Sequence, residues 1–388
     1  TTVDNDAKLL AFLVDPSLFT APYDAALDAG LSGSGVQTRW MVRPLRPGDR
    51  DELPPSRALP LFYRHIDQLG AIPERLRKVL KGASHLSGLV RLASLVRHHK
   101  PDVLHFQWTV VPPLDWAAAL LMRKKVAIVL TVHDTLPHNG ERVPFVQRWA
   151  FDLPIHAADR VIVHTHQGRK RLLDRGIPAE KISVIAHGPL CLPPELDARA
   201  RESTANDRTT FTLFGEIKHY KGWDVLVEAV GLIPPEVRAR IRILIAGRVQ
   251  MDVGPILARI EQLGIRDIFE LSLERQSERQ MAELFSRTDC FVFPYRAIDA
   301  SGVYFLTGSY SRWMIASDTG IFRESLREEE SGNLVAPERP DQLARAMIAF
   351  HAKRRRAPEK TGLQQWSEIG RHTHHVYKAA ILASKARA

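Results

Sequence analysis

Short apolar runs alternate with helix-like segments along the whole chain, and this alternation constrains the fold more than any other feature. In the first half, the apolar runs span residues 8–14, 36–42, 102–106, 126–132, 160–164 and 182–186. The second half repeats the pattern, with runs at 211–214, 242–246, 268–271, 290–293, 313–316 and 333–335. Strands that alternate with helices at this spacing predict parallel sheets with helices on both faces. The expected fold class is therefore α/β.

The length of the chain predicts more than one domain. A chain of 388 residues is too long for one ordinary hydrophobic core. The polar, charged stretch 193–208 fits a linker between two domains. We predict one Rossmann-like domain over residues 1–200, a second over residues 201–362, and a final helical segment, 363–388, that packs back on the first domain.

The chain carries a net charge of +10, which predicts an anionic partner. Nucleic acid, an acidic lipid surface and a phosphorylated substrate would each satisfy that charge. The two cysteines, Cys191 and Cys290, are far apart and give no zinc-binding spacing. The chain shows neither an export signal nor an apolar run near the ~20 residues of a membrane span. We therefore expect a cytoplasmic protein.

Basic and apolar residues interleave between residues 72 and 100, as in one or two amphipathic helices. The basic residues are Arg75, Arg77, Lys78, Lys81, Arg91, Arg97 and Lys100. An ordinary surface helix gives the same pattern. The alternative is a helix that contacts an anionic membrane face, with its basic stems covering apolar surface.

The stretch 211–230 predicts a buried strand, a glycine turn and a helix. Gly215 permits a tight turn, Lys218 and Lys221 follow, and Gly222 leads into the helix. A helix N-terminus and ammonium groups both favour phosphate oxygens, so the stretch predicts an anion site. A plain turn with solvated lysines is the alternative.

Polar residues gather where the strands of the first half end. They are Asp15, His105, Gln107, His133, His164 and His187. In an open parallel sheet, ligands bind outside the carboxyl ends of the strands. A single histidine in such a place is usually structural, whereas four together indicate a binding site.

Several segments occur in the order seen in retaining nucleotide-sugar glycosyltransferases. They are 214–222, 243–247, 291–303, and 315–320 followed by Glu324. Segments 103–108 and 131–138 are similar to the first domain of bacterial members that build exopolysaccharides. The chain thus resembles the family-four enzymes with the GT-B architecture. The resemblance implies two Rossmann-like domains that face each other across a cleft, with the nucleotide sugar on the second and the acceptor on the first.

The resemblance also assigns roles to residues. Lys218 and Lys221 would bind the donor diphosphate, although Glu216 stands where many members carry an arginine. The family's paired glutamates match Asp299 and Thr307. The second position therefore has no carboxylate with which to recognise the ribose. The catalytic set is His133, Lys218, Lys221 and Asp299. The donor-binding set is Gly215, Lys218, Lys221, Gly247, Ser301, Gly302, Val303 and Thr307, and the acceptor-binding set is Asp15, Tyr23, His105 and Asp134.

The predicted chemistry follows from charge. Two ammonium groups would stabilise the departing diphosphate by roughly 3 kcal/mol each, so no cofactor and no metal are expected. The Asp-x-Asp pairs, Asp4 with Asp6 and Asp49 with Asp51, lie in a tail and a loop. In a retaining reaction the departing phosphate can take the acceptor proton. In an inverting one, His133, Asp134 or Asp15 would be the base.

The expected donor is a UDP-sugar rather than a GDP-sugar, and the expected acceptor is a polyprenyl-diphosphate-linked oligosaccharide. Tyr23 could stack on a sugar ring or simply pack its loop. The basic helices in 72–100 would hold the protein on the inner face of the cell membrane. An epimerase-type GT-B enzyme and a nucleic-acid-binding protein are the alternatives. The second lacks any zinc, basic-zipper or RNA-binding signature, so we expect no nucleic-acid partner.

Overall fold

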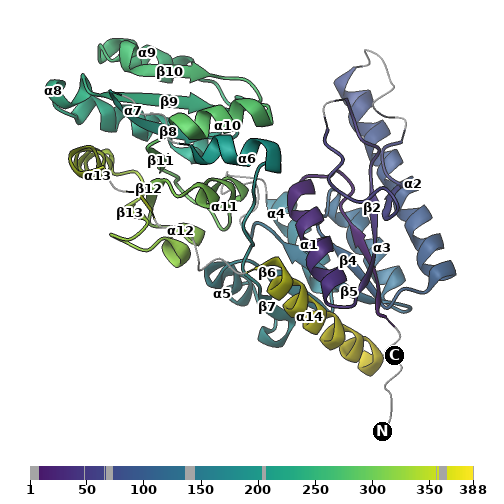
Figure 1. The fold of residues 1–388 in the computed structure, drawn as a ribbon. Coiled ribbons are helices and arrows are strands. Elements are labelled where there is room, and N and C mark those ends of the chain that lie inside the picture. The colour runs from purple at the N-terminus through teal and green to yellow at the C-terminus, as the bar shows by residue number, and fades with distance from the viewer. Residues whose placement is uncertain are drawn as a thin grey trace, which may run out of the picture. The chain divides into compact units, whose positions relative to one another are not determined.

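The computed structural model describes residues 8–47, 49–64, 66, 73–135, 145–202, 207–354, 356–357 and 365–387. The chain forms two compact units (Figure 1). Unit 1 holds the described residues up to 188 together with 365–387, and unit 2 holds those from 189 to 357. Asp4, Asp6, the end of the 131–138 motif and the predicted boundary at 362 lie outside the described residues.

Unit 1 is built on a seven-stranded parallel sheet in the order β3-β2-β1-β4-β5-β6-β7. The strands are β1 Leu10–Val14, β2 Gln37–Val42, β3 Ala58–Pro60, β4 Val103–Phe106, β5 Ala127–Val132, β6 Arg160–Val163 and β7 Ile182–Val184. The central strands β1, β4 and β5 are almost wholly buried, because helices cover both faces of the sheet.

Alternate residues of each strand face different helices. Ala11 and Leu13 pack with α1 and α14, whereas Phe12 and Val14 pack on the opposite face. The first face carries α1 Ala21–Gly33 and α14 Trp366–Arg387, which lie side by side (Figure 1). The opposite face carries α2 Glu74–His99, α3 Pro112–Met122, α4 Phe145–Ala157 and α5 His166–Asp174.

Two glycines bring α14 against α1. A methyl group on Gly30 would lie 2.1 Å from the Trp366 carbonyl oxygen, and one on Gly370 would lie 2.1 Å from the Gly30 carbonyl oxygen. The C-terminal helix is therefore an integral part of unit 1.

Unit 2 repeats the architecture with a six-stranded parallel sheet in the order β10-β9-β8-β11-β12-β13. The strands are β8 Thr209–Phe214, β9 Ile241–Ala246, β10 Phe269–Ser272, β11 Cys290–Phe293, β12 Trp313–Ser317 and β13 Gly332–Val335. One face packs against α7 Trp223–Leu232, α9 Gly254–Gln262 and α13 Pro340–Lys353. The other packs against α6 Pro194–Arg201, α10 Glu278–Arg287, α11 Gly302–Thr307 and α12 Gly320–Ser325. The short helix α8 Pro235–Arg238 precedes β9.

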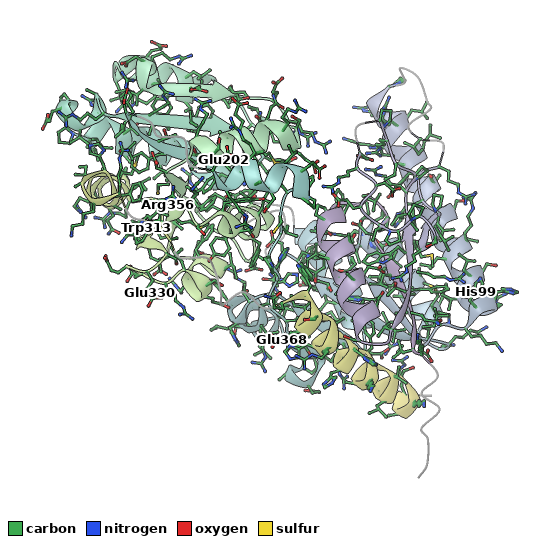
Figure 2. The ribbon with its side chains drawn as sticks, in the orientation of Figure 1. His99, Glu202, Trp313, Glu330, Arg356 and Glu368 are labelled. Carbon is green, nitrogen blue, oxygen red and sulfur yellow. The ribbon has the colours of Figure 1, made fainter. Side chains whose placement is uncertain are left out.

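The α/β class with parallel sheets is confirmed, and two local features differ from expectation. Strand β3 lies inside the segment 43–60, which is rich in proline, arginine and aspartate and is therefore expected to be a loop. Helix α6 occupies the predicted linker and packs on α10, so the chain enters unit 2 at Pro189. The segment 74–99 is a single helix, which agrees with the predicted one or two. Side chains fill both units, as Figure 2 shows, including Trp313 of β12, which is 3% exposed.

Candidate functional site

Lys221 is a buried lysine of unit 2. It ends the turn His219–Lys221 between β8 and α7, and it is only 4% exposed. Its ammonium donates a hydrogen bond to the Tyr295 hydroxyl at 2.8 Å and lies 4.8 Å from the centre of that ring. In the described part of the chain, no carboxylate lies within ion-pair distance of Lys221, and burial lowers the pKa of the ammonium below its usual value.

Glycines border the Lys221 ammonium. Gly215 has φ +105°, and a methyl group there would lie 3.0 Å from Lys221 Nζ and 2.8 Å from the Val303 side chain. Gly247, with φ +147°, backs onto Gly215, because a methyl group there would lie 2.0 Å from the Gly215 carbonyl oxygen. The fold thus brings together the ends of β8 and β9, Lys221, and the start of α11.

Lys218 has a different environment. Its ammonium pairs with the Glu216 carboxylate at 3.0 Å, and that carboxylate also pairs with Arg248 at 2.6 Å. Burial alone would raise the pKa of Glu216, but the hydrogen bonds from Lys218 and Arg248 lower it below its usual value. Lys218 is therefore a neutralised, partly exposed cation, whereas Lys221 is a buried one.

The segment after β11 carries the other residues predicted to bind the donor. Asp299 is 2% exposed, and its carbonyl accepts a hydrogen bond from the Ile321 amide at 2.8 Å. Ser301 caps α11 by accepting from the Tyr304 amide. Gly302 is exposed, and a methyl group there would meet nothing within 4 Å. Thr307 is fully buried and donates to the Val303 carbonyl at 2.9 Å, so its hydroxyl is used inside the helix.

In unit 1, the strand-end histidines form a hydrogen-bonded chain. His164 Nδ1 lies 2.9 Å from the Ile185 carbonyl oxygen, and His164 Nε2 lies 3.0 Å from His133 Nδ1. Because a carbonyl only accepts, His164 Nδ1 carries the proton and its Nε2 is the acceptor. His133 therefore donates from Nδ1, and its Nε2 presents a lone pair. Gln107 Oε1 lies 3.3 Å from that Nε2, so this tautomer requires the opposite orientation of the Gln107 amide, with its nitrogen toward His133.

Burial keeps these histidines neutral. It lowers the pKa of His164 to about 4, of His105 to about 3 and of His187 to about 3. Burial and the neighbouring histidines hold the pKa of His133 well below its usual value. Neutral rings can accept hydrogen bonds from hydroxyl groups, which is the property a sugar-binding histidine needs.

His133 also borders a small cavity at the ends of β4 and β5. The cavity has a volume of about 70 Å³, and its walls include Trp108 and Asp134. The Trp108 indole stacks on the His133 ring at 4.8 Å, and the Tyr23 ring lies edge-on at 4.9 Å. His105 lies deeper, fully buried between the Tyr377 and Thr131 hydroxyls at 2.7 and 2.8 Å.

Asp15 organises the loop between β1 and α1. Its carboxylate is fully buried and accepts from the backbone amides of Ser17 and Thr20 at 3.2 and 3.3 Å. It also hydrogen-bonds the buried carboxyl of Asp24. Burial raises the pKa of both carboxyls, and the pKa of Asp24 rises further because of the neighbouring Asp15 charge. The pair can therefore share a proton.

The predicted residues fall into two groups. In unit 2, Gly215, Lys221, Gly247 and Val303 come together, while Lys218 is engaged by Glu216. In unit 1, the Tyr23 and His133 rings lie together, and Asp15 and His105 are buried beneath them. Sequence patterns missed Tyr295 and Trp108, since only the fold brings them to Lys221 and His133. Among the described residues, no group of three or more histidine, cysteine or acidic side chains is arranged to hold a metal ion.

Comparison with protein families gives two matches that together span most of the chain. The model for Glycosyltransferase Family 4 matches residues 25–188, and the model for Glycosyl transferases group 1 matches residues 196–369. The chain belongs to the family-4 glycosyltransferases. Members of this family are retaining, metal-independent hexosyltransferases that depend on a nucleotide-sugar donor. The resemblance to the family-four enzymes and the predicted enzyme class are thus confirmed.

Solved structures show the same fold at low sequence identity. HepE of Anabaena in complex with UDP is 14% identical, with a TM-score of 0.62 and 98% of each chain covered. Sucrose-phosphate synthase of Thermosynechococcus elongatus is 17% identical, with a TM-score of 0.64, covering 98% of this chain and 97% of that one. The catalytic domain of starch synthase IV of Arabidopsis thaliana, bound to ADP and acarbose, is 12% identical, with a TM-score of 0.67, covering 96% of this chain and 99% of that one. These similarities confirm the predicted GT-B fold. No curated protein sequence matches the chain.

Proposed function

We propose that this glycosyltransferase moves a sugar from a UDP-sugar to a lipid-linked oligosaccharide or polysaccharide precursor in bacterial exopolysaccharide synthesis. It would work as a peripheral protein on the inner face of the cell membrane. Unit 2 would bind the donor, and unit 1 would bind the acceptor. The proposal rests on the environment of Lys221, on the histidine chain and on the surface of α2.

The observation that carries the donor assignment is the buried ammonium of Lys221. Burying a charge costs several kcal/mol unless an opposite charge compensates it. A diphosphate beside the Gly215 turn would supply that charge, since the lack of a side chain at Gly215 brings the backbone of the turn close to Nζ. Lys218 would add a second cation at the more exposed side, and Asp299 would hold hydroxyls of the sugar.

The expected chemistry follows from these positions. As the bond between the anomeric carbon and the diphosphate breaks, negative charge grows on the leaving group, and Lys221 stabilises it in a site with little water. The lone pair of His133 Nε2 would accept a hydrogen bond from a sugar hydroxyl, which would take the place of the Gln107 amide. Because the family retains configuration, the departing phosphate can take the acceptor proton, and no separate base is required.

A uridine nucleotide is favoured by a structural relative. HepE of Anabaena has been solved with UDP and with UDP-glucose. Its identity to this chain is 14–15%, so the comparison supports a UDP-sugar without naming the sugar.

The surface of α2 supports the membrane assignment. Four of the nine large apolar side chains that are exposed in the described part of the chain lie on this helix: Leu76, Val79, Leu86 and Val90. With the exposed Ala83, they recur at intervals of three and four residues, so they form one stripe along the helix. The buried residues Leu89, Leu92 and Val96 face the core instead. An apolar stripe with basic neighbours such as Arg75 and Arg91 suits an anionic lipid surface. Within the described residues, the structure contains no helix long and apolar enough to cross a membrane.

Donor binding tests the proposal most directly. The melting temperature would be measured with UDP-, GDP- and ADP-sugars, for the wild type, Lys221→Met and Lys353→Met. We expect a UDP-sugar to raise the melting temperature. Lys221→Met should weaken the binding of that donor by about 10- to 100-fold, since a hydrogen bond to a charged group contributes about 1.5–3 kcal/mol. Lys353→Met removes an exposed lysine of the same unit and should change nothing. A protein that responds to no nucleotide sugar, or a Lys221→Met variant that responds normally, would contradict the proposal.

A further inference from the structure

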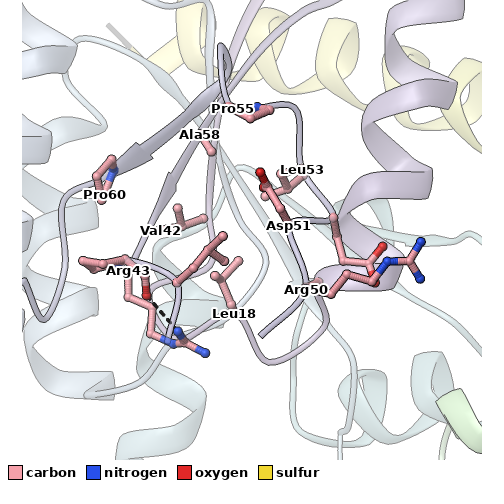
Figure 3. Close-up of a pocket in the computed structure, with 13 residues that line it drawn as sticks. Leu18, Val42, Arg43, Arg50, Asp51, Leu53, Pro55, Ala58 and Pro60 are labelled. Carbon is pink, nitrogen blue, oxygen red and sulfur yellow. Dashed lines mark hydrogen bonds and ion pairs between the residues drawn. The ribbon is translucent and has the colours of Figure 1, made fainter. Parts of the chain in front are cut away.

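A second cavity of unit 1 belongs to neither predicted site. It has a volume of about 340 Å³ and lies where β2 and β3 end, beside the loop between β1 and α1 (Figure 3). Nine of its thirteen lining residues are apolar, among them Leu18, Val42, Leu45, Leu53, Ala58 and Pro60. A volume of this size is at the lower end of the roughly 300–1,000 Å³ of small-molecule sites.

The charged residues of the cavity compensate one another. Two arginines, Arg43 and Arg50, stand against two acids, Asp51 and Glu52, so their formal charges cancel. Arg43 is 6% exposed and is engaged by the Ser17 and Pro44 carbonyls and by the Asp49 carboxylate. Arg50 lies 3.6 Å from the Glu52 carboxylate. This charge balance does not favour a phosphate or a carboxylate, and it suits an uncharged group.

Leu18 lies in the wall of the cavity, and its backbone has an unfavourable conformation. Its φ is +50°, a left-handed conformation that costs a leucine free energy and that surrounding structure must maintain. The Asp15 carboxylate fixes this loop through the Ser17 and Thr20 amides. Backbone strain that is held in place by a buried carboxylate points to a functional surface rather than to an incidental gap.

The cavity adjoins the chain that supports α2. Pro60 of its wall is followed by Leu61 and Phe62, which are buried in the core beneath α2. Arg91 of α2 donates to the Leu61 carbonyl at 3.4 Å, and the Phe62 ring fills the space that a side chain at Gly88 would need. The cavity and the apolar stripe of α2 are therefore structurally linked within unit 1.

We propose that this cavity binds an uncharged aliphatic chain segment, the part of a lipid-linked acceptor that follows its charged head. The inference rests on the proposed lipid-linked acceptor and adds a site for the lipid itself. The apolar walls would exclude water from the chain, which is the main source of affinity for such a ligand.

Direct binding of geraniol, a short branched isoprenoid alcohol, tests this assignment. Saturation-transfer NMR would be recorded on the full chain with geraniol, phenethyl alcohol, glucose and inorganic phosphate. We expect saturable binding of geraniol, weaker binding of the aromatic alcohol, and none of glucose or phosphate. Absence of saturable geraniol binding would overturn the proposal. Tighter binding of phenethyl alcohol would overturn the aliphatic assignment.

Two variants locate the binding. Ala58→Trp places an indole in the wall of the cavity and should weaken the binding of geraniol at least tenfold. The matched control Ala117→Trp adds the same indole on an exposed position of α3 and should leave binding unchanged. Leu45→Asp changes a side chain that is 48% exposed, so the fold should tolerate it, and it should weaken geraniol several-fold. Unchanged affinity in both Ala58→Trp and Leu45→Asp would place geraniol elsewhere and refute the proposal.

The donor response separates this test from the test of function. The UDP-sugar shift in melting temperature would be measured on the same samples. A wild type that binds geraniol at Ala58 but ignores every nucleotide sugar would contradict the proposed donor and still support the cavity. A wild type that responds to the UDP-sugar but not to geraniol would contradict the cavity alone.

Discussion

His164 Nε2 lies 3.0 Å from His133 Nδ1, and this contact fixes the protonation pattern of His133. The Ile185 carbonyl holds the proton of His164 on Nδ1, so His164 can only accept from His133 while both rings are neutral. His133 Nε2 is then an acceptor. The neighbouring Gln107 would satisfy it by presenting its amide nitrogen, which exchanges with the oxygen by a half-turn of the side chain.

The first prediction concerns His164→Phe. This variant removes the acceptor while keeping a ring of similar size, so the His133 proton should move in part from Nδ1 to Nε2. A nitrogen–proton correlation spectrum of the imidazole resonances reports the tautomer directly. The kcat/KM of sugar transfer should fall about tenfold, because the loss of one hydrogen bond costs about 1.4 kcal/mol.

A control separates this effect from a general loss of structure. His98→Gln changes an exposed histidine of α2 and should alter neither the His133 tautomer nor the rate. If His164→Phe leaves His133 protonated on Nδ1, the proposed role of His164 is wrong.

The second prediction is acid destabilisation of unit 1. The folded chain keeps His105, His164 and His187 neutral, with pKa values of about 3, 4 and 3. The unfolded chain protonates them below about pH 6.5, so it binds more protons and stability falls as the pH drops from 6.5 toward 4. Each histidine contributes about 1.4 kcal/mol per pH unit in that window. Urea unfolding at several pH values would measure the slope, which should be shallower in His164→Phe. A stability that does not change over this range would contradict the buried neutral cluster.

Much of the fold followed from the sequence because parallel strands buried on both faces are continuous apolar runs. Residues 8–14 predict such a strand, although nothing in the run tells which helix covers Leu13 and which covers Val14. Strand β3 was missed because three residues ending in Pro60 are too short to form a pattern. Helix α6 was missed because its charged composition resembles a linker, and only contact with α10 shows that it belongs to unit 2.

The candidate site was predictable in its residue types but not in its environments. Lys218 and Lys221 look alike in the sequence. In the fold, Glu216 and Arg248 engage the first, while Tyr295 and the glycine turn enclose the second. Arg248 follows β9 and Tyr295 follows β11, so local spacing carries no information about these two partners. For the same reason, the histidines could be placed at strand ends, but the direction of their hydrogen bonds could not be predicted.

The third prediction is that Lys221 lowers the stability of the unliganded protein. Replacing a buried, uncompensated ammonium by the similar-sized Met should raise the free energy of unfolding by about 1 kcal/mol, even though donor binding is lost. Because the pKa of Lys221 is lowered in the folded state, the wild type should also gain stability as the pH rises toward 10.5, and Lys221→Met should lack that gain.

Lys218→Met serves as the comparison for Lys221→Met. It breaks a partly exposed ion pair with Glu216 and should change stability by less than about 1 kcal/mol. Urea unfolding without nucleotide measures both variants. A Lys221→Met variant that is clearly less stable than the wild type would show that the ammonium has a structural role, contrary to the donor assignment.

The fourth prediction compares two glycines with similar backbones. Gly222 has φ +68° and Gly264 has φ +61°, but a methyl group on Gly222 would lie 2.0 Å from the Pro294 carbonyl oxygen, whereas one on Gly264 would meet nothing within 4 Å. Gly264→Ala should therefore cost only the left-handed conformation, about 1–2 kcal/mol. Gly222→Ala should cost more and displace the turn that carries Lys221. Urea unfolding and the UDP-sugar response would test both variants, and equal losses would contradict the close packing at Gly222.

The fifth prediction concerns the apolar stripe of α2. Val79 and Val90 are 67% and 63% exposed, so Val79→Glu with Val90→Glu should leave the fold intact. Each buried valine contributes up to about 1.5–3 kcal/mol to binding in an apolar environment, and new carboxylates are repelled by anionic lipids. Binding to vesicles that contain phosphatidylglycerol, measured by co-sedimentation, should fall at least tenfold. Leu121→Glu is the matched control, because it changes a 76% exposed apolar residue of α3 away from the stripe. If that control loses as much binding as the α2 variant, the attachment is a diffuse charge effect, and α2 is not the membrane-binding element.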